Sequence, residues 1–239
     1  MKKYLLFRLY GPMCSWGDIA VGETRPGFAH PTKSAILGMV AAALGIKREE
    51  DEKHKQLAES YAFAVLVEDM GIPLVDYHTA QVPPGKERYF TRKDELTLIP
   101  KNELKTILST RDYRVDAIYS VALCERKQNE WSVELLQEAL SRPVFTLYLG
   151  RKSCPLALLF QPQIVEKETL RDAFQSVQFV KLSELVDVDF PPEHKKILYW
   201  EKDQDSGIPE EHIFERRDIP LSRQRWQFDV RKEYHAAFI

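Results

Sequence analysis

The stretch KYLLFRLYGPMCSWG, residues 3–17, joins an apolar segment to a glycine-rich loop. Residues 3–10 are rich in leucine and aromatic side chains, which predicts a buried central strand. The glycines that follow let the backbone come close to a ligand. Farther along, apolar residues recur at helical spacing across residues 34–44, and Gly45 is the predicted helix stop. The chain is therefore predicted to begin with a strand, a loop and a helix.

The loop and the start of this helix carry groups that suit an anionic backbone. Arg25 and Lys33 add positive charge, and Trp16 offers a flat ring on which a base could stack. Thr32 and Ser34 flank the helix start, where free N–H groups favour phosphate. No G-x-x-x-x-G-K-[ST] motif is present, so this is not a P-loop. The alternative is an ordinary strand–loop–helix connection with the tryptophan in the core.

A second candidate binding loop reads YLGRKSCPL at residues 148–156. Its glycine permits a positive φ angle, and its basic and hydroxyl side chains can donate to phosphate. The candidate binding residues here are Tyr148, Gly150, Arg151, Lys152 and Ser153. The alternative is a basic turn at the end of a strand. We expect the two loops to lie near each other and to line one groove.

The order of the elements predicts an α+β fold. Strands are predicted at residues 3–10, 63–68, 115–124 and 145–148, and helices at 34–44 and 132–140. This β-α-β-β-α-β order is that of the ferredoxin-like (RRM-like) fold, an antiparallel sheet with helices on one face. Further strands are predicted at residues 176–181, 196–200, 212–216 and 226–234. We therefore predict a ferredoxin-like domain at 1–150 and a small β-rich C-terminal region at 151–239.

Residues 79–112 interrupt this pattern with dense charge and no sustained apolar face. Such a segment is predicted to protrude, either as a long hairpin or as a mobile loop. Its positive residues are Lys86, Arg88, Arg92, Lys93, Lys101, Lys105 and Arg111. These side chains could meet nucleic acid or a partner subunit, or they could simply be solvated.

The composition limits the possible functions. The formal net charge of −2 differs from the positive charge typical of a free-standing nucleic-acid binder, so any nucleic-acid surface must be local. Three cysteines without C-x-x-C spacing predict reduced thiols, and no secretory or membrane-spanning pattern is seen. No metal-ligand spacing occurs either. We expect a cytoplasmic protein without a membrane partner, metal ion or cofactor.

A catalytic alternative rests on Tyr77 and His78. A histidine beside a phenol could activate a ribose 2′-hydroxyl, with a nearby lysine steadying the charge. The simpler interpretation is that His78 packs at a strand end, so we predict no catalytic residue.

Several motifs of the chain, taken in order, resemble the CasD-type subunit of type I-E CRISPR Cascade complexes, in the RAMP superfamily. The matching segments are residues 11–17, 24–26, 31–34, 37–38, 44–46, 76–79 and 148–156. The resemblance extends from the N-terminus to about Leu156. Two departures stand out: Cys14 replaces a common glutamine, and Lys33 and Lys152 replace common arginines, which keeps the charge but loses the bidentate fork.

The resemblance implies a non-catalytic subunit of an antiviral surveillance complex. Such a subunit has a ferredoxin-like RNA-recognition domain, a protruding thumb and a small C-terminal part, so the candidate residues of the two loops are expected to contact RNA. It binds the 5′ handle of the guide RNA, caps the backbone filament, contacts the large subunit and meets target DNA through the assembled complex. In type I-C systems the related subunit is the processing nuclease. A metal-independent endoribonuclease that cuts CRISPR repeat RNA therefore remains the alternative.

Overall fold

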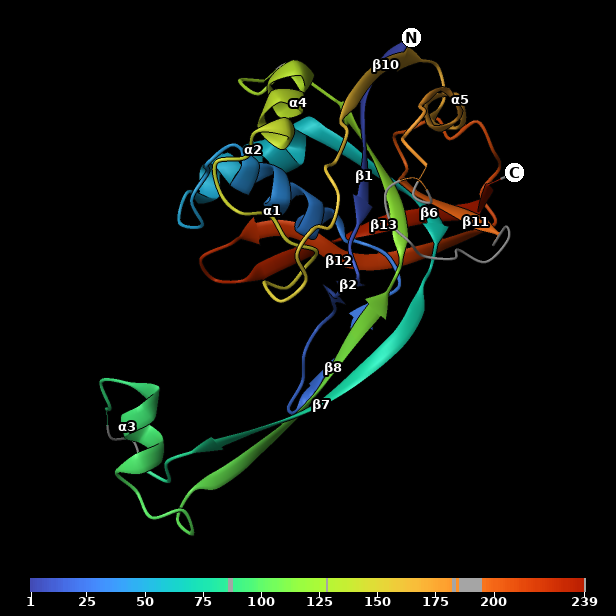
Figure 1. Cartoon of the computed structure of the whole chain (residues 1–239). Helices are drawn as coiled ribbons and strands as arrows, with labels where there is room; N and C mark the ends of the chain where they lie inside the picture. The colour runs from blue at the N-terminus through green and yellow to red at the C-terminus, as the bar shows by residue number, and fades with distance from the viewer. Residues whose placement is uncertain (86–87, 128, 182–183, 185–194, 239) are drawn as a thin grey trace.

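The computed structural model of the chain describes residues 1–85, 88–127, 129–181, 184 and 195–238. Its centre is an antiparallel sheet in the order β10-β1-β9-β6-β11-β13-β12 (Figure 1). The strands are β1 (Lys2–Tyr10), β6 (Tyr61–Asp69), β9 (Ile118–Glu125), β10 (Gln163–Lys167), β11 (Lys196–Glu201), β12 (His212–Ser222) and β13 (Gln227–Phe238). The most apolar strands, β1, β6 and β9, are buried between neighbours on both sides.

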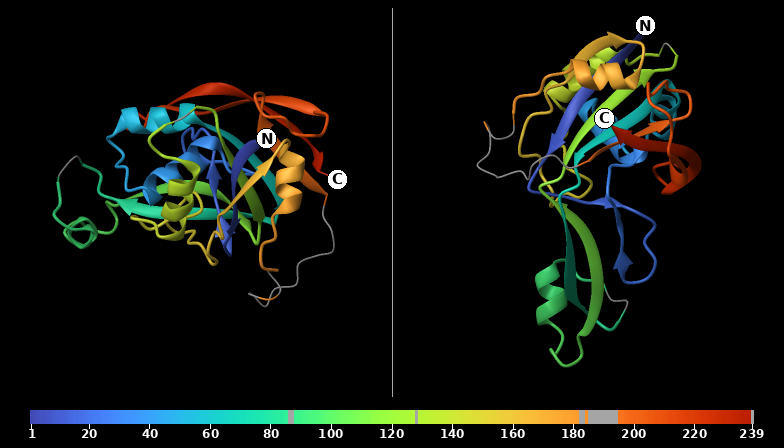
Figure 2. Two further views of the ribbon diagram at one scale, coloured as in Figure 1. Left: turned by 90° about the horizontal axis from the view of Figure 1, so that it is seen from above. Right: turned by 90° about the vertical axis from the view of Figure 1, so that its right-hand side faces the viewer.

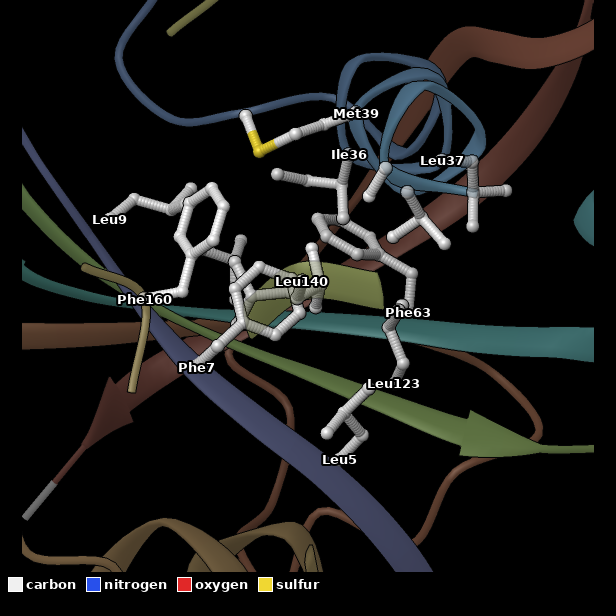
Figure 3. Close-up of a cluster of buried hydrophobic side chains, with 14 of the residues drawn as sticks. Leu5, Phe7, Leu9, Ile36, Leu37, Met39, Phe63, Leu123, Leu140 and Phe160 are labelled. Carbon is white, nitrogen blue, oxygen red and sulfur yellow. The ribbon is translucent and has the colours of Figure 1, made fainter. Parts of the chain in front are cut away.

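Helices cover both faces of this sheet. The helices are α1 (Lys33–Ala43), α2 (Asp51–Ser60), α4 (Val133–Ser141) and α5 (Leu170–Ser176). Successive side chains of a strand point to opposite faces. Leu5, Phe7 and Leu9 of β1 therefore join residues of α1, α2 and α4 in the larger core, which Figure 3 shows in part. Tyr4 and Leu6 lie on the opposite face, with residues of α5.

A long two-stranded hairpin projects from the sheet (Figures 1 and 2). Its arms, β7 (Ile72–Val82) and β8 (Lys105–Val115), pair along their whole length. The segment that connects them contains α3 (Arg92–Thr97) and lies at the tip of the hairpin (Figure 1). Near the base of the hairpin, β2 (Met13–Cys14) and β4 (Thr24–Arg25) pair with β8, and β3 (Trp16–Gly17) pairs with β5 (Gly27–Phe28). The sequence left open a long hairpin or a mobile loop for residues 79–112, and the structure has the hairpin. Its paired arms extend beyond the expected range at both ends, from Ile72 to Val115.

Two predicted strands are wrong. Residues 145–148 form no strand; the backbone N–H groups of Val144 and Phe145 instead donate to the carbonyls of Ala43 and Ala42, at 3.0 and 3.2 Å. This segment thus caps the end of α1, and the strand after α4 is β10. The predicted strand at 176–181 is also absent: Ser176 is the last residue of α5, and residues 177–181 form no helix or strand.

The predicted C-terminal strands at 196–200, 212–216 and 226–234 are confirmed as parts of β11, β12 and β13, except that Trp226 lies in the turn before β13. They extend the same sheet that contains β1. The division at residue 150 stays a prediction. Within the described ranges, no helix is both long and apolar enough to cross a bilayer.

Candidate nucleic-acid interface

The two predicted binding loops are in direct contact. The Ser15 N–H donates to the Leu149 carbonyl at 3.0 Å, and Arg151 Nε donates to Ser15 Oγ at 2.8 Å. Gly150 has φ +84°, and a Cβ there would lie 1.9 Å from the Ser15 carbonyl oxygen. Only a glycine allows this approach. The expected proximity of the loops is therefore confirmed.

Several predicted RNA contacts in the second loop are open to solvent. Lys152 and Ser153 are exposed, and the Tyr148 side chain is partly exposed. Arg151 is half-buried, with its guanidinium carbon 5.3 Å from the centre of the Tyr113 ring. The loop thus offers two cations, a hydroxyl and an aromatic ring at one surface.

A second positive pair lies at the base of the hairpin. Arg25 on β4 lies opposite Arg111 on β8 in a parallel pairing, and both side chains are half-buried. Arg25 Nη1 donates to the carbonyls of Gly22 and Thr24, at 2.5 and 3.0 Å. These bonds hold the arginine beside the hairpin, where β2 also joins the first loop to β8.

Trp16 and Lys33 do not have the exposure that RNA contact requires. Trp16 is 1% exposed and packs edge-on against Tyr119, with ring centres 5.8 Å apart. Lys33 is also 1% exposed, and its Nζ lies 3.1 Å from both carboxylate oxygens of Glu201. Burial lowers the pKa of this lysine, and the Glu201 carboxylate opposes that effect. Both assignments are corrected: the ring belongs to the core and the lysine to a buried ion pair.

The start of α1 is already occupied by groups of the chain itself. Asp218 Oδ2 accepts a hydrogen bond from the Lys33 backbone N–H at 2.8 Å. Thr32, 5% exposed, accepts from the Ala35 N–H at 3.0 Å, and Ser34 is half-buried beside it. The anion at this helix start is thus the Asp218 carboxylate, so the predicted phosphate site there is also corrected.

Asp218 belongs to a buried network of charges on β12 and β13. Arg231 donates to Asp218 at 2.6 Å and to Glu233 at 2.6 Å, and Arg216 donates to Glu233 at 2.8 Å. The charged neighbours lower the Glu233 pKa. His30 Nε2 lies 2.9 Å from Glu233, and burial lowers the pKa of His30 to about 4. This network fixes the start of α1 to the C-terminal strands.

A cleft of about 990 Å³ lies beside these loops. It is bordered by α1, residues 17–20, residues 146–150 and the turn between β12 and β13. The residues that the sequence analysis missed are Arg217, Arg223, Trp226 and Phe228. A usable signal was present, since RQRW at residues 223–226 places basic and aromatic residues together between two strands.

The charged residues of the hairpin are spread along it. Arg92 pairs with Glu95 and also donates to the Gln81 carbonyl. The exposed cations of the hairpin are Arg88, Arg92, Lys93, Lys101 and Lys105. Lys86 lies outside the described residues.

Tyr77 and His78 are neighbours on β7, opposite Thr110 and Ser109 of β8. Successive side chains of a strand point to opposite faces, so these two do not converge on one site. In the part of the chain that the structure describes, no group of three or more His, Cys, Asp or Glu residues is arranged to hold a metal ion.

Comparisons with known proteins find matches among CRISPR-associated proteins. The profile of the family described as "CRISPR-associated protein (Cas_Cas5)" matches residues 4–234. The "CRISPR system Cascade subunit CasD" of Escherichia coli (strain K12) is 36% identical over 164 residues, which cover 65% of this chain and 68% of that protein.

Two solved structures resemble nearly the whole chain. One, "CRISPR RNA-guided surveillance complex", has a TM-score of 0.64 and 25% identity and covers 98% of this chain and 90% of that chain. The other, "Crystal structure of Cas protein", has a TM-score of 0.60 and 25% identity, with 98% and 94% covered.

Proposed function

The chain belongs to the Cas5 family of CRISPR-associated proteins, and we propose that it is a non-catalytic Cascade subunit that binds the 5′ handle of the guide RNA. In this role it caps the backbone filament and supports RNA-guided binding of foreign DNA. The observation that carries the proposal is the contact between the two loops, through Ser15, Gly150 and Arg151. This contact gathers the exposed Lys152 and Ser153 into a surface suited to a single-stranded backbone.

The proposal interprets the fold as a ferredoxin-like RNA-recognition unit with a thumb. The two β-α-β units are β1-α1-β6 and β9-α4-β10, and their strands lie in the order β10-β1-β9-β6. The hairpin of β7 and β8 is the proposed thumb. Its exposed cations suit RNA phosphates or acidic surface on the neighbouring backbone or large subunit.

The non-catalytic part of the proposal rests on the placement of Tyr77 and His78. Their side chains point to opposite faces of the hairpin, so a base and a phenol are not brought to one ribose. We expect no specific cleavage of repeat RNA in EDTA. Products with a 5′-hydroxyl and a cyclic phosphate, lost in His78→Ala, would favour the endoribonuclease instead.

RNA binding is tested by fluorescence anisotropy with labelled 5′-handle RNA over a series of salt concentrations. Lys152→Ala, Arg151→Ala and Arg25→Ala should each weaken binding and reduce the salt slope by roughly 0.7, the value for one phosphate contact on a single strand. Lys196→Ala is the matched control, because this exposed lysine at the start of β11 lies outside both loops. Three variants that bind like wild type, with unchanged circular dichroism, would contradict the proposed surface.

A further inference from the structure

The turn between β12 and β13 is fixed to the start of α2. The Asp51 carboxylate accepts hydrogen bonds from Ser222 Oγ at 2.6 Å, Arg223 N–H at 2.7 Å and Gln224 N–H at 3.3 Å. Trp226 in this turn has φ +58°, a left-handed conformation that is unusual for a bulky residue. Strained residues of this kind persist where the surrounding structure holds them, often at ligand sites. The turn thus holds a tryptophan in place that is 58% exposed.

Arg223 places a largely unpaired cation in the same cleft. Its guanidinium lies against α1 and donates to the Ser34 carbonyl. Gly38 makes room for it, since a Cβ there would lie 2.8 Å from Arg223 Nη2. Among the described residues no carboxylate forms an ion pair with this guanidinium. The nearby Asp51 bonds the Arg223 backbone N–H and not its side chain. Burial, reinforced by the nearby Arg48, lowers the Arg223 pKa to about 10.

Arg223 is half-buried and has no carboxylate partner among the described residues, and a bound anion offsets the cost of partly desolvating its charge. The exposed Arg217 lines the same cleft and has no ion pair within the described residues. The cleft therefore offers an anion two guanidinium groups, one of them fixed by α1.

Aromatic rings stand next to these cations. Phe228 lies edge-on to Trp226 at 5.5 Å between ring centres, and the Arg48 guanidinium carbon lies 4.5 Å from the centre of the Trp226 ring. Tyr148, from the second binding loop, also lines the cleft. Arginine beside exposed aromatic rings is the combination with which proteins hold unpaired bases and their phosphates.

We propose that this cleft binds unpaired nucleotides of RNA, with a base stacked on Trp226 and a phosphate at Arg223 and Arg217. The inference rests on the proposed function and extends the RNA path from the second loop, across α1, to the C-terminal hairpin. The volume of about 990 Å³ lies at the upper end of usual ligand pockets, about 300–1,000 Å³, and accommodates more than one nucleotide. An acidic segment of a partner protein is the competing occupant.

The test uses the full chain and fluorescein-labelled 5′-handle RNA, together with a set of the same RNA carrying one abasic site at each position. The abasic RNAs keep every phosphate and remove one base at a time. We expect one abasic RNA to bind wild type about tenfold more weakly, the size of one stacking contact. Trp226→Ala should bind intact RNA about tenfold more weakly and no longer distinguish that abasic RNA. Trp226→Phe should retain most of the difference.

Arg223→Gln should reduce the salt slope by roughly 0.7. The matched control is Phe214→Ala, a ring that is 50% exposed on β12 but outside the cleft. It should bind both RNAs as wild type does, and thermal melting of every variant should give one cooperative transition near that of wild type.

The outcomes separate this inference from the proposed function. If Lys152→Ala weakens binding but Trp226→Ala and Arg223→Gln bind as wild type does, the cleft is not an RNA site and the handle surface stands. If wild type binds no handle RNA, both are overturned. If Trp226→Ala leaves RNA binding intact but prevents entry into the assembled complex, the occupant is a protein and the inference is wrong.

Discussion

At the scale of single residues, the surroundings of a charge decide its role more than its place in a motif. Lys33 and Lys152 both occupy motif positions that suit phosphate. Lys33 is buried in an ion pair with Glu201, whereas Lys152 is exposed, so of the two only Lys152 is accessible to RNA. Sequence spacing alone carries no information on this difference, because Glu201 lies 168 positions away in the chain.

Lys33→Met is expected to destabilise the protein. The substitution removes the lysine partner of Glu201, whose carboxylate stays buried and keeps only its bonds to the Phe63 N–H and Arg126. Breaking a buried ion pair costs about 3–5 kcal/mol. Urea unfolding followed by circular dichroism measures the loss. Lys152→Met, an exposed control, should change stability by less than about 0.5 kcal/mol. A Lys33→Met protein as stable as wild type, but weak in RNA binding, would restore the phosphate role.

His30 should make stability depend on pH in the acidic range. Burial, together with Arg216 and Arg231, keeps it neutral in the folded state with a pKa of about 4, whereas the unfolded value is 6.5; Glu233 acts in the opposite direction. Between these two values the unfolded chain binds more protons, so stability falls as pH falls from 6.5 toward 4.

This pH dependence is measured by urea unfolding at several pH values. His30→Gln should reduce the slope in that window, and His78→Gln, which alters an exposed histidine, should leave it unchanged. An unchanged slope in His30→Gln would mean that other groups account for the acid sensitivity. Glu233, whose pKa is lowered by its charged neighbours, contributes at lower pH.

At the scale of elements, periodicity identified the long buried elements but not the exposed arms of the hairpin, and it failed for short elements. The apolar runs of β1, β6 and β9 and the small-residue pattern of α1 were predictable because each is long and buried. The run FTLY at 145–148 has strand-forming residues, yet Phe145 and the preceding Val144 donate hydrogen bonds to the end of α1. The ferredoxin-like order of elements predicted that the two loops lie close together, and Gly150 permits their contact. The C-terminal wall of the cleft depends on the long-range contact of α1 with β12, which no local pattern contains.

Replacing residues 80–107 with Asn-Gly tests the hairpin as an element. Thr79 and Leu108 are opposite each other on β7 and β8, so a two-residue turn can join them. The change keeps Asp112, whose carboxylate accepts from the Gly27 N–H at 3.2 Å. We expect one cooperative melting transition near that of wild type and retained handle binding.

The shortened protein should fail to enter the assembled complex, as judged by co-purification with the other subunits. A control variant keeps the full-length hairpin and replaces Lys93, Lys101 and Lys105 with glutamine. Comparing the two proteins separates the effect of removing the arm from the effect of removing its positive charges. Normal assembly of the shortened protein would show that the hairpin has no part in it.

At the scale of the whole molecule, one sheet joins both ends of the chain. β10 forms the edge beside β1, while β11 lies beside β6 and continues to β13 and β12. The ion pair of Lys33 with Glu201 crosses from α1 to β11. The C-terminal strands therefore complete the structure around α1 as well as the wall of the cleft.

A fragment of residues 1–150 should not fold cooperatively. It lacks β10, β11 and α5, so two strand edges and the apolar face around Tyr4 and Leu6 are exposed, and Lys33 loses its partner. Thermal and urea unfolding should show no sharp transition. The protein shortened at 80–107 is the control for lost length. A cooperative transition in the fragment would support a separate domain at 1–150.

The hairpin also gives the molecule a mechanical lever. β6 runs into β7, and β8 runs into β9, through Gly71 at φ +61° and Asp116 at φ +55°, and a Cβ on Gly71 would lie 2.2 Å from the Val115 carbonyl oxygen. Eleven residues of strand make an arm of about 35 Å. A sideways push of ~3 Å at the tip then tilts the arm by about 5°. We expect a force on the tip to act as a torque at the two joins, Gly71 and Asp116. Because these joins continue into β6 and β9, the force is transmitted to the middle of the sheet.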